Sequence, residues 1–201
     1  MNCPICNDRG VTPNNTLCVC KLKDIIKTSL PQELIKLKTP KLIIDKNLLG
    51  KNIYFGGGTI NGITPKQIIK AYIINQLINN LSFSFYYGSV KSIFDIYMSS
   101  DNDLQSSIVK QDLLVMKIGN DVKNQYILEL IPNIIGERVS NNLPTIILWD
   151  NKIIKDSVDK THYIKERYNE LTYKYIASDF VIADKAIIIK DKRLSLKGES
   201  K

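Results

Sequence analysis

The sequence predicts an α/β protein in which helices cover a parallel sheet and a small zinc-binding knuckle precedes it. Three observations lead to this prediction. All four cysteines of the 201-residue chain lie within its first 20 residues. From residue 52 onward, short apolar stretches alternate with amphipathic ones, which is typical of buried parallel strands alternating with helices. A glycine-rich loop at 57–64 follows the first apolar stretch, where parallel sheets place their ligands.

The cysteines predict a metal site. Cys3, Cys6, Cys18 and Cys20 have the spacing C-x2-C-x11-C-x-C. Zinc prefers four soft ligands in a tetrahedron, and two closely spaced cysteine pairs supply them. A pair of disulfide bonds is the alternative, but a cytosolic chain is kept reduced. Four thiolates leave no open coordination position, so we expect a structural zinc ion that holds residues 1–22 together as a knuckle.

Composition indicates an ordinary globular protein with basic ends. The chain is 44% hydrophobic and 24% charged, with a formal net charge of +8. Residues 1–50 carry 8 basic and 4 acidic side chains, and residues 151–201 carry 12 and 8. This excess fits a nucleic-acid partner and equally a lysine-rich soluble surface. No run of 18 apolar residues and no apolar signal segment occurs, so we expect a cytoplasmic protein without a membrane partner.

Local patterns then predict each element in order. An amphipathic stretch divided by Pro31 predicts a helical linker at 23–48. Apolar runs bounded by turn residues predict strands at 52–55, 82–87, 112–118 and 143–149. Amphipathic stretches between and after them predict helices at 65–80, 89–98, 122–139 and 157–177. A terminal strand or hairpin is expected at 180–190, so the α/β domain spans 49–201.

The loop at 57–64 reads GGTINGIT and fits the phosphate-binding pattern G-x-x-x-x-G-K-[ST] except at one position. In that pattern backbone N–H groups cradle phosphates, the lysine reaches the β/γ-phosphates and the hydroxyl binds Mg²⁺. Gly57, Gly62 and Thr64 fall on register as phosphate-binding candidates, whereas Ile63 replaces the lysine. A structural interpretation also holds, with Thr64 as the N-cap of the following helix and Gln67 completing a capping box.

Two further segments complete a family pattern. Residues 112–119 read DLLVMKIG, and residues 142–150 read NLPTIILWD. With the cysteine knuckle and the glycine loop, in this order, they resemble the bacterial and phage replicative-helicase loaders of the DnaC/DnaI/IstB type, which are AAA+ ATPases. The resemblance covers most of residues 1–150. It implies an AAA+/P-loop-like core, with 52–64 as the Walker A strand and loop and 112–119 as the Walker B strand.

The residues that run the family's chemistry are replaced. Besides Ile63, Lys117 and Ile118 stand where two acidic residues are expected, and the sensor-1 position holds Asp150, or Trp149 if the register slips by one. A lysine cannot bind Mg²⁺ and would repel it. The resemblance therefore implies degenerate Walker motifs and a pseudo-ATPase, with no catalytic residues and with zinc in place of ATP as the cofactor.

These features predict a non-catalytic accessory protein of DNA replication that binds a replicative helicase or helicase loader and single-stranded DNA. Three alternatives stay open: a nucleotide-dependent loader that uses Lys117 or a partner's residues, a zinc-containing transcription or RNA polymerase accessory factor, and an inhibitor of host helicase loading. The tyrosines and lysines of 160–174 offer a stacking surface for single strands, although an amphipathic helix that buries its tyrosines is the favoured interpretation. His162, the only histidine, is expected on the surface.

Overall fold

The computed structural model describes nine stretches of the chain, at 3–14, 18–40, 48–56, 58–60, 62–80, 82–99, 102–119, 124–149 and 168–183. They fall into two compact units. One comprises Met1–Pro40 and Lys66–Ser82, and the other Lys41–Pro65 and Phe83–Lys201. The helix after the glycine loop thus groups with the amino-terminal unit, although the boundaries predicted at residues 22 and 48 assign it to the α/β domain.

The larger unit is built on a five-stranded sheet that is parallel throughout, which confirms the predicted fold class. Its strands are β1 (Asn52–Phe55), β2 (Phe85–Ser89), β3 (Leu113–Ile118), β4 (Thr145–Trp149) and β5 (Phe180–Ile182). They lie in the order β2-β3-β4-β1-β5. Because all strands run in one direction, the carboxyl ends of β1, β3 and β4 share one edge of the sheet, which we call the carboxyl edge.

The central strands are mostly apolar, because both of their faces are buried. Five of the six residues of β3 and all five of β4 are buried. The exception in β3 is Lys117, which is half-buried near the carboxyl edge.

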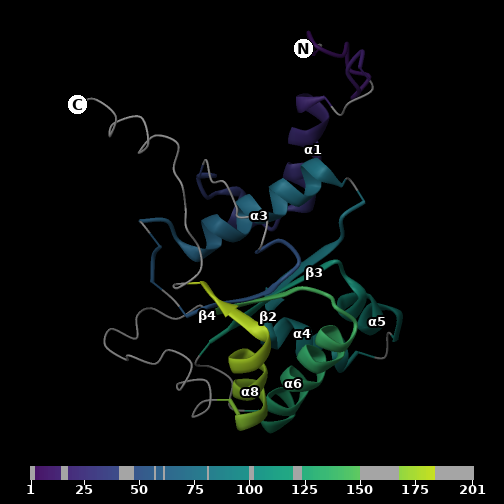
Figure 1. Ribbon diagram of the computed structural model, residues 1–201. Helices are drawn as coiled ribbons and strands as arrows, with labels where there is room; N and C mark the ends of the chain where they lie inside the picture. Colours follow the sequence, from purple (N-terminus) through teal and green to yellow (C-terminus); the bar gives the residue numbers. More distant parts are fainter. Residues whose placement is uncertain are drawn as a thin grey trace, which may run out of the picture. The chain divides into compact units, whose positions relative to one another are not determined.

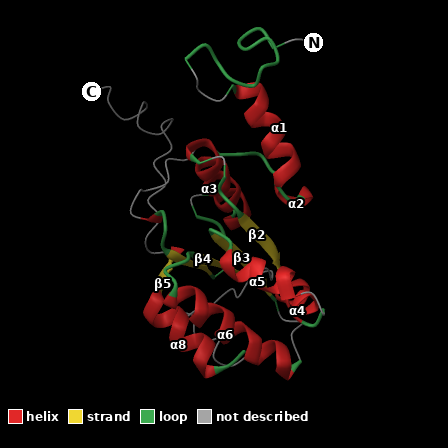
Figure 2. Ribbon diagram, turned by 90° about the vertical axis from the view of Figure 1, so that its right-hand side faces the viewer, coloured by secondary structure: helices red, strands yellow, loops and turns green. Residues whose placement is uncertain are grey.

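Helices α4 (Val90–Tyr97), α5 (Asn102–Lys110), α6 (Gln125–Ser140) and α8 (Glu170–Asp179) lie on one side of this sheet (Figures 1 and 2). Their apolar faces pack on alternate strand residues, such as Tyr54, Leu114 and Ile147, to form the main core. Side-chain caps start three of these helices, from Ser89, Asn124 and Asn169. Each cap supplies an acceptor for an N–H group that the helix itself leaves unbonded.

Three sequence expectations differ in detail from the structure. Strand β2 begins at Phe85 instead of residue 82. The local patterns predict no helix at 102–110, but the structure shows α5 there, with Asp103 in its first turn, where a carboxylate is favourable. The predicted helix at 157–177 is observed from Glu170 onward, and residues 150–167 and 184–201 lie outside the described residues.

The smaller unit contains the cysteine knuckle and helices α1 (Val19–Ser29), α2 (Gln32–Ile35) and α3 (Pro65–Asn79). The predicted break at Pro31 is confirmed, since this residue separates α1 from α2. The Lys70 ammonium of α3 donates to the carbonyls of Ile35 and Leu37, at 3.1 and 2.7 Å, and so caps the end of α2. Every helix in the described ranges falls short of what a bilayer crossing requires in length or in apolarity.

Candidate metal centre and phosphate-loop region

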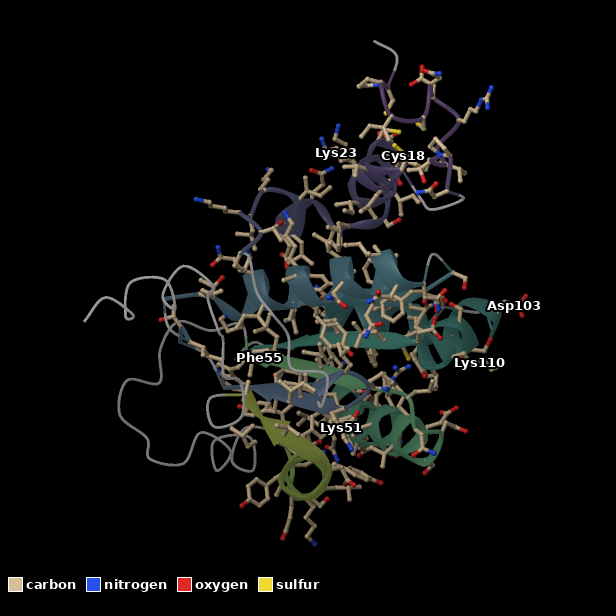
Figure 3. All side chains as sticks on the ribbon, turned by 45° about the horizontal axis from the view of Figure 1, so that its top comes forward. Cys18, Lys23, Lys51, Phe55, Asp103 and Lys110 are labelled. Carbon is tan, nitrogen blue, oxygen red and sulfur yellow. The ribbon has the colours of Figure 1, made fainter. Side chains whose placement is uncertain are left out.

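The four cysteines converge as the sequence predicts. Their sulfur atoms all lie within 4.8 Å of one another. The Cys3 and Cys18 sulfurs are 3.6 Å apart, and those of Cys6 and Cys20 are 3.3 Å apart. Figure 3 shows Cys18 at the start of α1 with the sulfur atoms of the knuckle gathered beside it. The four side chains are buried or half-buried and all are free thiols.

Local backbone structure positions both cysteine pairs. After the first pair, Asn7 donates its N–H to the Cys3 carbonyl at 2.8 Å, and Arg9 donates to the Cys6 carbonyl at 3.0 Å. The turn places Asn7 and Asp8 at φ values of 46° and 63°, which asparagine and aspartate tolerate better than other side chains. The Asp8 carboxylate accepts the Cys3 N–H at 2.8 Å and closes the turn.

The second pair lies at a helix start. Cys18 is the N-cap of α1, and Cys20 lies in the first turn of that helix. Cys18 also donates its N–H to the Gly10 carbonyl at 2.9 Å, which joins the two halves of the knuckle. The Cys20 N–H at the start of α1 lowers the pKa of the Cys18 thiol, but burial and the neighbouring Cys6 and Cys3 sulfurs outweigh it and raise that pKa above its ordinary value.

The electrostatics of the metal-free cluster also favour a cation. The backbone N–H groups of Ile5 and Cys6 lower the pKa of the Cys3 thiol to about 7. The nearby Cys6 sulfur, followed by burial, raises the pKa of the Cys20 thiol to about 12. The cluster therefore resists complete ionisation near neutral pH, because four thiolates at this spacing repel one another. A divalent cation removes that repulsion.

The donor set fits zinc. Within the described residues the cluster consists of four sulfur donors and includes no carboxylate or imidazole ligand. Such donors are the ligands of structural zinc sites, and they leave no position for water or substrate. Cys3, Cys6, Cys18 and Cys20 would hold the ion, which would supply cohesion and no reaction chemistry.

Of the three phosphate-binding candidates, the structure describes only Gly62 and Thr64. Gly57 lies outside the described residues. Gly62 has a φ of 76°, and half-buried Thr64 directly precedes α3. Between them the backbone closes on itself, because Ile60 and Ile63 exchange two N–H···O bonds of 2.9 and 3.0 Å. Their two N–H groups are thus paired within the loop, whereas a phosphate cradle needs N–H groups directed at the ligand.

The Walker B candidates lie on opposite faces of β3. Ile118 is 1% exposed and belongs to the main core. Lys117 is on the other face, and its ammonium lies 5.0 Å from the centre of the Tyr87 ring on β2. The register pairs Lys117 with Leu148, and Leu148 with Phe55 at the end of β1. Lys117 thus lies two strands away from the glycine loop and extends toward the opposite neighbour.

At the end of β4, Trp149 is buried and its ring meets Tyr168 edge-on, with centroids 6.1 Å apart. Asp150, the other sensor-1 candidate, lies outside the described residues, as do His162 and Tyr163. Tyr168 is 6% exposed, and Tyr175 packs against the core. These two tyrosines agree with the interpretation that the segment buries its aromatic rings. Tyr173 is half-buried, and Tyr163 lies outside the described residues, so the choice between the two interpretations stays open.

The structure also assigns a role to Arg138, for which the sequence patterns indicate no side-chain function. This side chain is fully buried, and burial lowers its pKa to about 10. Its guanidinium donates to the carbonyls of Val109, Gln111 and Pro144, at 2.5, 3.0 and 2.7 Å, and to the Thr145 hydroxyl at 3.0 Å. These acceptors precede β3 or begin β4, so Arg138 fastens the amino ends of both strands.

Two further side chains, of Asn52 and Asp112, also join neighbouring strands where the strands begin. We call such hydrogen-bonded links clips, and this edge of the sheet the amino edge. The Asn52 side chain accepts the Thr145 N–H at 2.8 Å and joins the first residues of β1 and β4. The Asp112 carboxylate accepts the N–H of Ser84 at 2.8 Å and its hydroxyl at 3.0 Å, just before β2 and β3 begin. The helical periodicity of α6 contains a signal for Arg138, since it falls on the face of Ile127, Ile131 and Ile134.

Comparison with known proteins shows that the fold is similar to solved structures. No family model matches the chain, and no curated protein matches it. Among solved structures, the DnaC helicase loader aligns with a TM-score of 0.56 and 17% identity, over 83% of this chain and 90% of that one. The replication initiator DnaA, bound to AMPPCP and single-stranded DNA, aligns with a TM-score of 0.48 and 12% identity, over 79% of this chain and 44% of that one. By this similarity, the chain shares the fold of the DnaC helicase loader.

Proposed function

We propose that this protein is a DNA-replication accessory factor of the helicase-loader type that works without hydrolysing ATP. The observation that carries the proposal is the DnaC-like fold, which extends over 83% of the chain. Its partners are a replicative helicase or a helicase loader, together with single-stranded DNA.

Three features at the carboxyl edge support the non-catalytic part of the proposal. A cation, Lys117, stands where Mg²⁺ coordination needs an acid, and its ammonium lies over the Tyr87 ring. Ile118 is held in the core. The loop backbone pairs with itself at Ile60 and Ile63. Phosphoryl transfer depends on positioned charge around Mg²⁺ and the phosphates, so each replacement removes a required group.

In this proposal the protein acts on the helicase by binding to it, without ATP hydrolysis. A ligand shifts a conformational equilibrium by as much as its affinities for the two states differ. An accessory factor that prefers one state of a helicase ring can therefore stabilise that state without hydrolysis. In this proposal the zinc knuckle contacts the partner protein. Metal ligation stabilises the knuckle, because about 20 residues are too few to build a hydrophobic core.

Affinity capture tests this function. The tagged full-length chain is expressed in its native host or infected cell, and the proteins retained in moderate salt are identified by mass spectrometry. Recovery of a replicative helicase or loader supports the proposal, and a helicase-loading assay then distinguishes a helper from an inhibitor. Recovery of RNA polymerase without any replication protein would favour a transcription accessory factor instead. A matched Cys18→Ser, Cys20→Ser variant reports whether the knuckle contributes to capture.

A further inference from the structure

Helix α1 lacks most of what stabilises the other helices of this chain. Its N-cap residue, Cys18, makes no side-chain capping hydrogen bond, and its first turn contains no acidic residue. By contrast, the side chains of Ser89, Asn124 and Asn169 cap α4, α6 and α8. Every other helix in the described ranges contains at least one buried residue, whereas α1 contains none. Capping and the burial of an apolar face are the usual sources of helix stability in proteins.

The sequence of α1 is also unfavourable for a helix that stands alone. Four of its eleven residues are β-branched and lose side-chain freedom in a helix. Lys21 and Lys23 place positive charge near the positive end of the helix dipole. Helices shorter than about 12–15 residues are marginal in water even when their sequences are favourable. The helix therefore needs support from outside its own sequence.

The cysteine cluster can supply that support at the start of the helix. Cys18 is the N-cap and Cys20 is the second residue of α1, so the first turn provides two of the four sulfurs that converge within 4.8 Å. A divalent cation that ties these two residues to Cys3 and Cys6 fixes the backbone of the first turn, which is the costly step in forming a helix. Four thiolates around the cation keep a net charge of about −2, which is favourable at a helix N-terminus. Metal ligation thus takes the place of the missing side-chain cap.

The other end of α1 is anchored by the fold. Figure 2 shows α1 running from the knuckle to α2. Leu30, which directly follows α1, is buried, and so is Leu34 of α2. On α3, the Lys70 ammonium donates to two carbonyls at or just beyond the end of α2, and the Gln67 side chain donates to the Lys38 carbonyl at 3.1 Å. These contacts hold α2 on α3 and involve none of the cysteines.

We infer that α1 is a metal-dependent helix, which forms when the four cysteines bind zinc and unravels as far as Leu30 when the metal is withdrawn. Metal occupancy thus switches the knuckle and α1 together, while α2 and α3 stay folded. The proposed function places the partner contact on the knuckle, so withdrawal of zinc would also switch that contact off. Only this last step rests on the proposed function, because the folding of α1 requires no partner.

Amide hydrogen exchange of the full-length chain tests the inference. Cys6→Ala removes one ligand without changing α1, and EDTA treatment of the wild type gives a second metal-free form, with zinc content measured by elemental analysis. Relative to the zinc-loaded wild type, exchange at 19–29 should accelerate about tenfold or more, and exchange at 65–79 less than about twofold. Slow exchange at 19–29 in either metal-free form would overturn the inference. Acceleration that spreads into α3 would also overturn it, since the metal would then support the whole smaller unit.

A capped variant tests the reason for the metal dependence. Cys18→Asp and Lys21→Glu, added to Cys6→Ala, supply an N-cap carboxylate and the glutamate of a capping box. Without metal, this variant should exchange about fivefold more slowly at 19–29 than Cys6→Ala alone, which corresponds to about 1 kcal/mol. The matched control is Lys27→Glu in the same Cys6→Ala background, which makes the charge change of Lys21→Glu in the last turn of α1 and should not slow exchange.

Equal exchange in the capped variant and in Cys6→Ala would overturn the role of the metal as the cap of α1. The proposed function is judged separately, by affinity capture. If the zinc-loaded wild type captures no replication protein, the proposed function fails, and the exchange measurements still decide whether α1 depends on the metal.

Discussion

The ammonium of Lys117 lies 5.0 Å from the centre of the Tyr87 ring, across the β2–β3 pair. A cation over an aromatic face gains about 0.5–1 kcal/mol at accessible sites. The lysine therefore has a structural partner on β2, on the side of β3 away from the glycine loop. This contact explains how a positive charge is accommodated on β3, at a position where the resemblance to helicase loaders predicts an acidic residue.

The first prediction concerns Lys117 and nucleotides. We expect Lys117→Ala to lower the free energy of unfolding by about 0.5–1 kcal/mol and to leave nucleotide affinity unchanged, because the ammonium contacts Tyr87 and no phosphate. Urea denaturation and fluorescence anisotropy with a labelled ATP analogue measure the two effects. Tyr87→Leu is the matched control for the lost contact. Tight ATP binding by the wild type that Lys117→Ala abolishes would instead identify a nucleotide-dependent loader.

The second prediction concerns the metal. The purified chain should contain one zinc ion, and Cys18→Ser should lose it, because Cys18 is fully buried among the other three thiols and also begins α1. Amide hydrogen exchange should then accelerate in residues 3–29, while the sheet unit keeps its protection. Elemental analysis and exchange mass spectrometry provide the measurements. A metal-free wild type grown in zinc-supplemented medium, with the same exchange pattern as the variant, would contradict the assignment.

The third prediction concerns Arg138. Replacement by methionine keeps most of the side-chain volume but leaves four acceptors, two in buried and two in half-buried residues, without their donor. We therefore expect a loss of about 3–5 kcal/mol in the free energy of unfolding. A lysine at this position supplies fewer donors in a different geometry, so the stability of Arg138→Lys should fall between those of the wild type and Arg138→Met. Urea denaturation followed by circular dichroism measures the series. A loss below about 1 kcal/mol for Arg138→Met would show that these bonds contribute little.

The fourth prediction concerns the contact between α6 and α8. A Cβ added to Gly136 would lie 2.6 Å from the Tyr175 hydroxyl oxygen, so Gly136→Ala forces the tyrosine to move. Alanine is otherwise better than glycine in a helix by about 1 kcal/mol. In a Tyr175→Phe background, Gly136→Ala should therefore be more favourable than in the wild type, by about 1 kcal/mol. A double-mutant cycle of thermal unfolding measures this coupling, and additive effects would exclude it.

The fifth prediction concerns Lys70 and pH. Burial lowers the pKa of Lys70 below its ordinary value of 10.5, so the folded state favours the neutral amine more than the unfolded chain does. The cost of burying the charge is complete at pH values below the lowered pKa and disappears as the pH rises toward 10.5. The wild type should thus gain stability relative to Lys70→Met across that window. Lys70→Arg, which stays charged, should show no such gain in urea titrations at the two ends of the window.

Much of the sheet could be predicted from the sequence because its strands are mostly apolar, as in Leu113–Ile118 and Thr145–Trp149. The start of β2 could not be predicted from local sequence patterns, because it depends on a contact with a distant residue. Ser84 bonds to the Asp112 carboxylate 28 residues away, and the regular strand begins only after it. The hydrogen-bonding role of Arg138 could not be predicted for a similar reason, because its acceptors come from segments up to 29 residues away. Local patterns do not show such partners.

The cysteine cluster was predictable because the type and spacing of its residues indicate it, and the four sulfur atoms do lie within 4.8 Å of one another. The structure of the glycine loop was harder to predict, because the same residues fit both a phosphate-binding loop and a tight turn before a helix. Its Asn61-Gly62 pair between two isoleucines is a two-residue hairpin signal, which the phosphate-loop interpretation did not use. The paired backbone of Ile60 and Ile63 agrees with that hairpin signal.

The clips at the amino edge have a consequence for how such a protein can change over generations. Arg138, Asn52 and Asp112 fasten strands β1 to β4 where the strands begin, and none of them reaches the opposite rim. Selection for a folded chain therefore acts on these polar side chains as well as on the apolar core, which includes Ile118 and Trp149 at the carboxyl edge. A lineage that keeps both can exchange its exposed residues and still inherit the same sheet.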